Sequence, residues 1–412
     1  MNRFRPARVK GRKGLAAGGE SENRVAPRGK FNSSPLAVWL QGSGEFFYFV
    51  HWRKKGTSCR DCCGIWFLPF LAKGFTPKRN GGKTLPFLDP AEGNRYFGNQ
   101  QFHLKLVKTT PADPGRGYVP AYHFEMVADG MVVGRCNLRV GQGENIRYAG
   151  NIGYEVEMGY RGRHYALRAA RLLLRLAFRH RMQRVLITCR PDNLPSRKTC
   201  ERLGAVLCGQ VTVPAVHEMY RDGDRELLQY EVDLQDCILP ALESDIPKIA
   251  QLYDAITEAE AAGQNFSGWE KGEYPEEWTA RELYDRGGLH VVLDATGRKV
   301  IASAAYDNDH EPCYERVAWS RPIPSEQTLC VHTLAVHPDC RGRGLGEKLM
   351  RFGFAQASER HLAGVRIDTW VGNEPGLRLY HRLGYRDAGV LEQDVHYSGD
   401  RMAYQFLEWY GE

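Results

Sequence analysis

The fold is decided by the stretch Gln327-Thr-Leu-Cys-Val-His-Thr-Leu-Ala-Val-His-Pro-Asp-Cys-Arg-Gly-Arg-Gly-Leu-Gly-Glu347. Its first part is apolar and rich in strand-forming residues, and this pattern stops at Pro338. After the glycines, Leu345, Leu349 and Phe352 recur at helical spacing. The stretch therefore predicts a strand, a tight turn and a helix.

The turn itself reads Arg341-Gly342-Arg343-Gly344-Leu345-Gly346. A glycine-rich turn at a helix N-terminus gathers unpaired backbone N–H groups and the positive end of the helix dipole, which suits a pyrophosphate. Glycine also leaves no Cβ to hold phosphates away. An ordinary strand-to-helix connection has the same pattern, so the turn becomes specific only in combination with a second motif further along the chain.

About thirty residues further on, Val365-Arg-Ile-Asp-Thr-Trp370 predicts another strand, and a helical segment lies between Asn373 and Tyr385. The two segments together resemble the GNAT superfamily of acyl-CoA-dependent N-acetyltransferases. The family's R/Q-x-x-G-x-G/A turn is matched by Arg341, Gly344 and Gly346. Its later motif is matched by five residues: Asn373, Leu379, Tyr380, Gly384 and Tyr385.

The resemblance implies an α/β fold, sandwich-like, with a mixed and mostly antiparallel sheet flanked by helices. It implies acetyl-CoA as the cosubstrate, no metal, and Tyr380 as the acid that protonates the departing thiolate. The strand would pair with the pantetheine arm. The cofactor-binding residues implied are Leu334, Val336, Arg341, Gly342, Arg343, Gly344, Leu345, Gly346 and Asn373.

His332 is the candidate base for the acceptor amine. Most amines are charged at neutral pH, so a base or a water chain must remove a proton before attack. His332 lies two residues before Leu334 on the same strand face. Arylalkylamine N-acetyltransferases, a branch of the same superfamily, carry a histidine in the matching place. A half-buried strand histidine bonded to a neighbour is an equally weighted reading.

The chain repeats this pattern at a constant offset of 180 residues. Arg161-Gly-Arg-His-Tyr-Ala166 aligns with the turn at Arg341, and Asn193 aligns with Asn373. A period this long indicates duplicated domains, because solenoid repeats are much shorter. We expect an N-terminal domain over 84–236 and a catalytic C-terminal domain over 237–412, which form a pseudo-dimer within the chain.

The first copy lacks two features of the second. His164 stands where the motif has glycine, which adds bulk where backbone must approach phosphate. Cys200 stands at the position of Tyr380 and is a poor acid for expelling another thiolate. We therefore favour a degenerate, structural first domain over an active one.

Residues 1–83 carry 17 Lys and Arg against 4 Asp and Glu, so the remaining chain has a net charge of −6. The excess positive charge thus lies outside the predicted domains, which makes nucleic acid an improbable partner. We expect this segment to be disordered. A presequence, a nucleic-acid arm or an extension without function are the alternatives. Cys59-x-x-Cys62-Cys63 has no second pair at ligand spacing, so we expect no zinc there.

No apolar run reaches the roughly 18 residues that span a bilayer. Eleven cysteines without regular spacing or a secretory signal indicate reduced thiols, so we expect a cytoplasmic protein without membrane contact.

Substrate selection is expected from the segment 266–275 and from loops near Asp307. The aromatic candidates are Trp269, Tyr274, Tyr306 and Trp319, and acids beside them can receive a cationic amine. The leading hypothesis is acetylation of a primary amine on a small molecule or a peptide N-terminus. The alternatives are a non-catalytic acyl-CoA sensor or scaffold, and two domains active on different acceptors. The sequence does not define the acceptor or the oligomeric state.

Overall fold

The computed structural model describes residues 36–42, 45–51, 87, 98, 101–263, 267–394 and 401–411. The chain divides into two compact units, Met1–Gly82 and Lys83–Glu412. In the first, β1 (Leu36–Gly42) and β2 (Glu45–His51) pair as an antiparallel hairpin. The rest of the segment expected to be disordered, with its Cys59–Cys63 motif, lies outside the described residues.

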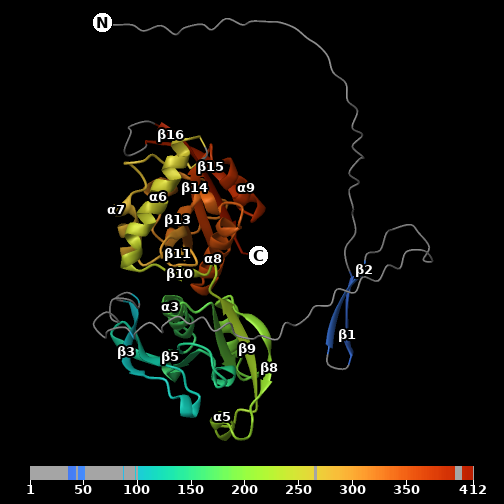
Figure 1. Ribbon diagram of the computed structural model, residues 1–412. Helices are drawn as coiled ribbons and strands as arrows, with labels where there is room; N and C mark the ends of the chain where they lie inside the picture. Colours follow the sequence, from blue (N-terminus) through green and yellow to red (C-terminus); the bar gives the residue numbers. More distant parts are fainter. Residues whose placement is uncertain are drawn as a thin grey trace, which may run out of the picture. The chain divides into compact units, whose positions relative to one another are not determined.

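In the first half of the larger unit the strands form two sheets (Figure 1). One is antiparallel with the order β3-β4-β5-β6, and the other has the order β7-β9-β8. The strands are β3 (Phe102–Thr110), β4 (Ala121–Ala128), β5 (Met131–Arg139), β6 (Ile152–Val156), β7 (Arg184–Cys189), β8 (Val206–Thr212) and β9 (Glu226–Asp233). The helices are α2 (Ile146–Ala149), α3 (Tyr165–Arg179), α4 (Leu194–Arg202) and α5 (Glu218–Arg221).

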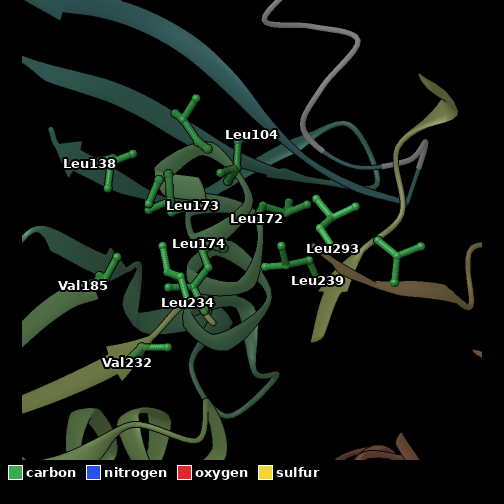
Figure 2. Packing of buried hydrophobic residues seen from close by; sticks show 14 of the residues in the cluster. Leu104, Leu138, Leu172, Leu173, Leu174, Val185, Val232, Leu234, Leu239 and Leu293 are labelled. Atoms are coloured by element: carbon green, nitrogen blue, oxygen red, sulfur yellow. The ribbon is translucent and has the colours of Figure 1, made fainter. Parts of the chain in front are cut away.

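Helix α3 is buried on several sides, and its four arginines, at 168, 171, 175 and 179, lie along one stripe. Leu104 and Leu138 contact it from one sheet, and Val185 and Val232 contact it from the other (Figure 2). Leu239 and Leu293 belong to the second half of the unit and lie in the same cluster. The apolar residues of α3 are therefore buried against both halves of the unit.

The second half is built on one seven-stranded sheet with the order β10-β11-β12-β13-β14-β16-β15. Its strands are β10 (Ile238–Pro240), β11 (Leu289–Leu293), β12 (Val300–Asp307), β13 (Thr328–Val336), β14 (Gly364–Trp370), β15 (Arg386–Asp394) and β16 (Arg401–Tyr410). Its helices are α6 (Ile246–Ala261), α7 (Glu277–Asp285), α8 (Leu345–Glu359) and α9 (Glu374–Arg382). Short 3-10 turns are η1 (Pro114–Arg116), η2 (Met158–Tyr160), η3 (Glu243–Asp245), η4 (Pro312–Arg316), η5 (Ser325–Gln327) and η6 (Pro338–Cys340).

Within this sheet β13 and β14 are parallel, and the neighbouring pairs are antiparallel. The mixed, mostly antiparallel sheet flanked by helices is confirmed for this half, with α6 and α7 on one face and α8 and α9 on the other (Figure 1). The first half differs because its sheet is divided between β6 and β7. No helix of the described part of the chain is long and apolar enough to cross a membrane.

Two ion pairs reach from α3 into the second half. Arg171 forms a bidentate pair with Glu359 at 2.8 Å, and Arg175 pairs with the fully buried Asp245. Asp245 also accepts the backbone N–H of Leu242 at 3.0 Å, so this carboxylate joins the two halves and orders the turn before α6. Shared apolar core and buried ion pairs make residues 83–412 one compact unit.

Candidate functional site

The turn before α8 has the shape that a diphosphate requires. Gly342 and Gly344 adopt left-handed φ values of 75° and 76°, and Gly344 is the N-cap of α8. Among the described residues, no atom lies within 4 Å of where a Cβ on either glycine would sit. A Cβ on Gly346 would lie 3.3 Å from the Leu379 side chain, so this glycine permits close packing of α8 against α9. The first N–H groups of α8 are thus presented on an open surface.

One arginine of the turn is held by the connection between the two halves. Arg343 donates to the Asp236 carboxylate at 2.5 Å, and Lys348 donates to the Asp236 carbonyl at 2.7 Å. Arg341 is exposed and begins the extended backbone after η6. Neither Lys348 nor Asp236 was predicted from the sequence as a site residue, although Lys348 follows Gly344 at helical spacing. Arg343 would therefore contact phosphate as part of an ion pair.

A slot opens beside this turn because β13 and β14 diverge. Their pairing ends at Cys330 and Arg366, so one edge of β13 has no strand partner from Val331 to Val336 among the described residues. On the other edge, a register shift opposite Ala304 marks a bulge, and Thr333 there has a φ of 44°. A β-branched residue with positive φ is an outlier that surrounding structure must enforce. Backbone N–H groups at this bulge and edge are available to a ligand.

Tyr380 lies in the apolar cluster that surrounds this slot, together with Leu334, Val336, Leu345 and Leu379. It is 4% exposed, and its hydroxyl makes no hydrogen bond to the residues that the structure describes. Burial raises the pKa of Tyr380, and the Asp368 carboxylate raises it further. The phenol therefore remains protonated at neutral pH and retains a proton to donate.

Asn373 was predicted to bind the cofactor, but its side chain is engaged in the start of α9. Its Oδ1 accepts the N–H of Gly376 at 3.0 Å, and its Nδ2 donates to Thr369 Oγ1 at 2.8 Å. A capping asparagine of this kind satisfies an otherwise unpaired helix N–H. Asn373 thus positions α9, and with it Tyr380, in this structure.

His332 forms a close pair with Asp307 at the end of β12. His332 Nε2 lies 2.8 Å from Asp307 Oδ1, and Cys330 Sγ lies 4.0 Å from His332 Nδ1. Burial lowers the pKa of His332, but Cys330 and Asp307 raise it more strongly, to about 11. Burial raises the pKa of Asp307, but its bond to His332 and other contacts leave it below its ordinary value. The pair is therefore imidazolium and carboxylate at neutral pH.

This charge state changes the role expected of His332. An imidazolium has no free electron pair, so His332 can accept a proton only after it has lost its own. The second oxygen of Asp307, Oδ2, is buried without a hydrogen-bond partner in the described part of the chain. The site thus holds a histidine–aspartate pair whose imidazole becomes neutral only at alkaline pH.

A second half-buried carboxylate, Asp368, lies on the same face of the sheet. Tyr314 donates to Asp368 Oδ1 at 2.6 Å, and Cys330 Sγ lies 3.4 Å from the Tyr314 hydroxyl. Burial raises the pKa of Asp368 above its ordinary value. Trp319, one of the predicted substrate residues, donates its indole N–H to the Tyr314 carbonyl at 2.9 Å. Sequence spacing gave no signal for Tyr314 and Asp368, which are 54 residues apart.

The other predicted aromatic residues lie on opposite faces of the seven-stranded sheet. Trp269 packs edge-on against Tyr253 and Tyr274, with ring centroids 6.0 and 6.4 Å apart. Tyr253 donates to Thr333 Oγ1 at 3.4 Å, which brings this aromatic group to the bulge. Tyr306 lies on the opposite face, fully buried, with its hydroxyl on the Leu349 carbonyl at 2.8 Å. Strand alternation turns Tyr306 toward α8, away from the face that holds His332 and Asp307.

In the first half, side chains cross the equivalent slot. The Tyr154 hydroxyl lies 2.9 Å from Ser196 Oγ and 3.8 Å from Cys200 Sγ, and so joins β6 to α4. His164 keeps a left-handed φ of 57°, and its ring accepts a hydrogen bond from Arg202 at 2.9 Å. No group of His, Cys, Asp and Glu in either half, as far as it is described, could hold a metal ion.

Comparisons with known proteins match both halves. The Acetyltransferase (GNAT) family model matches residues 250–385, and the Acetyltransferase (GNAT) domain model matches residues 86–206. A mycothiol acetyltransferase from Rhodococcus jostii (strain RHA1) is 30% identical over 170 residues, 40% of this chain and 53% of that protein. A mycothiol acetyltransferase from Clavibacter michiganensis subsp. michiganensis is 40% identical over 67 residues, which are 16% of this chain and 21% of that protein. The chain spans about half the length, or less, of these curated relatives.

Among solved structures, the ribosomal-protein-alanine N-acetyltransferase from Brucella melitensis aligns with 21% identity. The alignment covers 42% of this chain and 98% of the Brucella melitensis protein, with a TM-score of 0.32.

Proposed function

Because the chain belongs to the GNAT superfamily and carries two of its domains in tandem, we propose that it is an acetyl-CoA-dependent N-acetyltransferase. The chemistry takes place in the C-terminal domain, and the acceptor is a primary amine of a small molecule or a peptide N-terminus. We place the domains at 84–236 and 237–412. The cysteines of the described residues are free thiols, which suits the cytoplasm.

The observation that carries this proposal is the contrast between the two slots. In the second half, Leu334 and Tyr380 flank a strand edge that has no partner in the described part of the chain. In the first half, Tyr154 crosses the same place and contacts Cys200. A thioester arm that lies along β13 would have no equivalent path along β6.

The binding steps depend on the turn and the strand. The N–H groups at the start of α8, between Gly342 and Gly346, would bind the pyrophosphate, with Arg341 and Arg343 supplying positive charge. The unpaired edge of β13 at Leu334 and Val336 would pair with the amides of the pantetheine arm. The thioester carbonyl then lies at the bulge, where backbone N–H groups can stabilise a developing oxyanion.

The chemical step moves two protons. The neutral amine attacks the thioester carbon and forms the new C–N bond, and the negative charge passes to the carbonyl oxygen at the bulge. As the C–S bond breaks, the Tyr380 hydroxyl donates its proton to the sulfur, which leaves as a free thiol. The proton lost by the amine passes to His332 in its neutral form, with Asp307 fixing the imidazole.

The test is amine-dependent release of free thiol from acetyl-CoA by the full-length protein, assayed with a panel of primary amines. We expect turnover with at least one class of amine, and loss of most of this turnover in Tyr380→Phe. The matched variant Cys200→Ser, at the same place in the first half, should keep the parent rate. Acetyl-CoA binding without turnover on any amine would favour a sensor or scaffold. Loss of turnover in Cys200→Ser alone would mean that the chemistry belongs to the first half.

A further inference from the structure

A second site lies away from the acetyl-CoA turn, at the far end of α8. It is a cleft of about 930 Å³ lined by the first-half turn with Arg163 and His164, by α3, by residues 240–242, by the loop from α7 to β11 and by the C-terminal end of α8. Helix α8 has 15 residues, and at 1.5 Å per residue it separates the cleft from the Gly344 turn by about 22 Å. Both halves of the compact unit contribute to the walls. The charged side chains of the lining include Arg163, Arg168, Arg171, Arg286, Arg360 and Asp307.

Part of this charge is already compensated inside the protein. Arg171 forms its bidentate pair with Glu359, and Arg286 pairs with Asp309 at 3.0 Å. Asp307 is paired with His332. Three arginines of the cleft remain, namely Arg163, Arg168 and Arg360, against one further lining acid, Asp285. The cleft therefore presents an excess of positive charge.

Arg168 and Arg360 come from different halves and influence each other. Burial lowers the pKa of Arg168, and the positive charge of Arg360 lowers it further. Arg168 stacks over the Phe102 ring at 4.3 Å, and Arg360 donates weakly to the Tyr306 carbonyl at 3.3 Å. Neither forms an ion pair with a carboxylate of the described residues. Asp307 and Glu359 offset part of the charge on Arg360, and Asp129 offsets part of the charge on Arg168. An anion bound between the two arginines would offset the charge that is left.

We propose that this cleft binds a small polyanion, a phosphorylated or polycarboxylic metabolite, between Arg168 and Arg360. A guanidinium presents a planar fork of donors that matches the oxygens of phosphate and carboxylate in pairs. A volume of about 930 Å³ lies within the range of small-ligand pockets, roughly 300–1,000 Å³. The bound anion would join the two halves through one arginine from each.

The cleft also reaches the back of the acceptor site. Asp307 lines it and binds His332 through Oδ1, and Arg286 helps to hold the pKa of Asp307 down. A ligand in the cleft would therefore lie close to the acid–base pair of the proposed reaction without touching the acetyl-CoA turn.

The test uses the full chain carrying Gly344→Asp, so that anions cannot occupy the acetyl-CoA turn. Inorganic pyrophosphate and citrate are titrated separately by calorimetry. We expect one site per chain for at least one of them, weakened about tenfold or more by Arg168→Gln and by Arg360→Gln, and weakened by salt. Binding of pyrophosphate alone would identify phosphate as the recognised group, and binding of citrate alone would identify polycarboxylate.

The control is Arg378→Gln, which removes an exposed arginine on α9 and should leave binding unchanged. Because neither Arg168 nor Arg360 forms an ion pair with a carboxylate of the described residues, their glutamine variants should unfold at about the same temperature as the parent. Absence of binding by both anions would overturn the proposal, and so would binding that survives both substitutions. Because acetyl-CoA is not used, this result is independent of the proposed acetyltransferase activity.

Discussion

The two glycine-rich turns have the same backbone shape and different surroundings. Gly342 and Gly344 have φ values of 75° and 76°, and Gly162 and His164 have values of 85° and 57°. The first turn thus keeps its left-handed positions although one of them is a histidine. We expected His164 to add bulk where backbone must approach phosphate. In the structure the turn keeps its left-handed backbone, and the imidazole accepts a hydrogen bond from Arg202. The two copies thus share the backbone shape of the glycine-rich turn and differ in the side chains around it.

The strands that precede the turns differ more than the turns do. β13 carries a bulge at Thr333, whereas β6 pairs with β5 in a continuous register through the equivalent Gly153. At the next position β13 has Leu334 and β6 has Tyr154, which bonds across to α4. The proposed assignment of the chemistry to the second half therefore depends on the bulge in β13 and on the leucine at the position where β6 has Tyr154.

The largest effect is expected at the turn itself. Gly344→Asp places a carboxylate against the bound diphosphate, at a cost of about 4 kcal/mol for charges 4 Å apart, or about a thousandfold in affinity. Its positive φ adds a folding cost of about 1 kcal/mol. Calorimetric titration with acetyl-CoA measures the loss of affinity, and urea unfolding measures the folding cost. His164→Asp is the matched control, and an equal loss of affinity there would remove the distinction between the halves.

The connection between the halves can be tested at two equivalent arginines. Arg171→Ala leaves Glu359 buried without its partner and should lower the free energy of unfolding by about 3 kcal/mol or more. Arg351 is its counterpart on α8 and makes an exposed pair with Glu347, so Arg351→Ala should cost less than about 1 kcal/mol. Urea unfolding monitored by circular dichroism measures both. Equal costs would mean that the halves do not depend on each other.

Tyr380→Phe should lower turnover about 100-fold, because general acid catalysis contributes roughly that factor or more. Affinity for acetyl-CoA should change little, since the hydroxyl makes no bond to the described residues. Tyr385→Phe is the control, because the Tyr385 hydroxyl is also buried without a partner in the described part of the chain but lies outside the predicted chemistry. Steady-state kinetics of thiol release separates the two. A similar fall in both variants would show that only packing had been disturbed.

The smallest effect concerns pH. With an acceptor amine whose own pKa lies below about 7, turnover should rise toward alkaline pH, because His332 has a pKa raised to about 11 and is basic only when it loses its proton. Asp307→Asn removes a group that raises this pKa, so the rise should move about one pH unit lower. The pH profile of kcat is the measurement. If kcat rises at the same pH in Asp307→Asn as in the parent, a group other than His332 causes the rise.

The parts of the fold that depend on local pattern were predictable. The apolar run ending at Pro338, the glycines and the helical spacing from Leu345 define β13, the turn and α8, and the 180-residue offset locates their counterparts. The turn before α8 depends only on backbone geometry, and the positions of the glycines predict that geometry directly.

The parts that depend on register and on distant contacts were not predictable. Tyr306 is one residue from Asp307, yet only the pairing of β12 with β13 shows which of them faces His332. The raised pKa of His332 depends on Cys330 and on the Asp307 carboxylate, which lies 25 residues earlier in the chain. The obstruction in the first half depends on a tyrosine hydroxyl meeting a serine 42 residues away. No spacing rule anticipates such contacts, because they are made by folding.

The central claim is that one of the two cradles accepts acetyl-CoA and the other does not. Calorimetric titration of the full chain with acetyl-CoA tests it most directly through the number of molecules bound. We expect one per chain, and none in Gly344→Asp. Two molecules per chain, or a single site that persists in Gly344→Asp, would contradict the account.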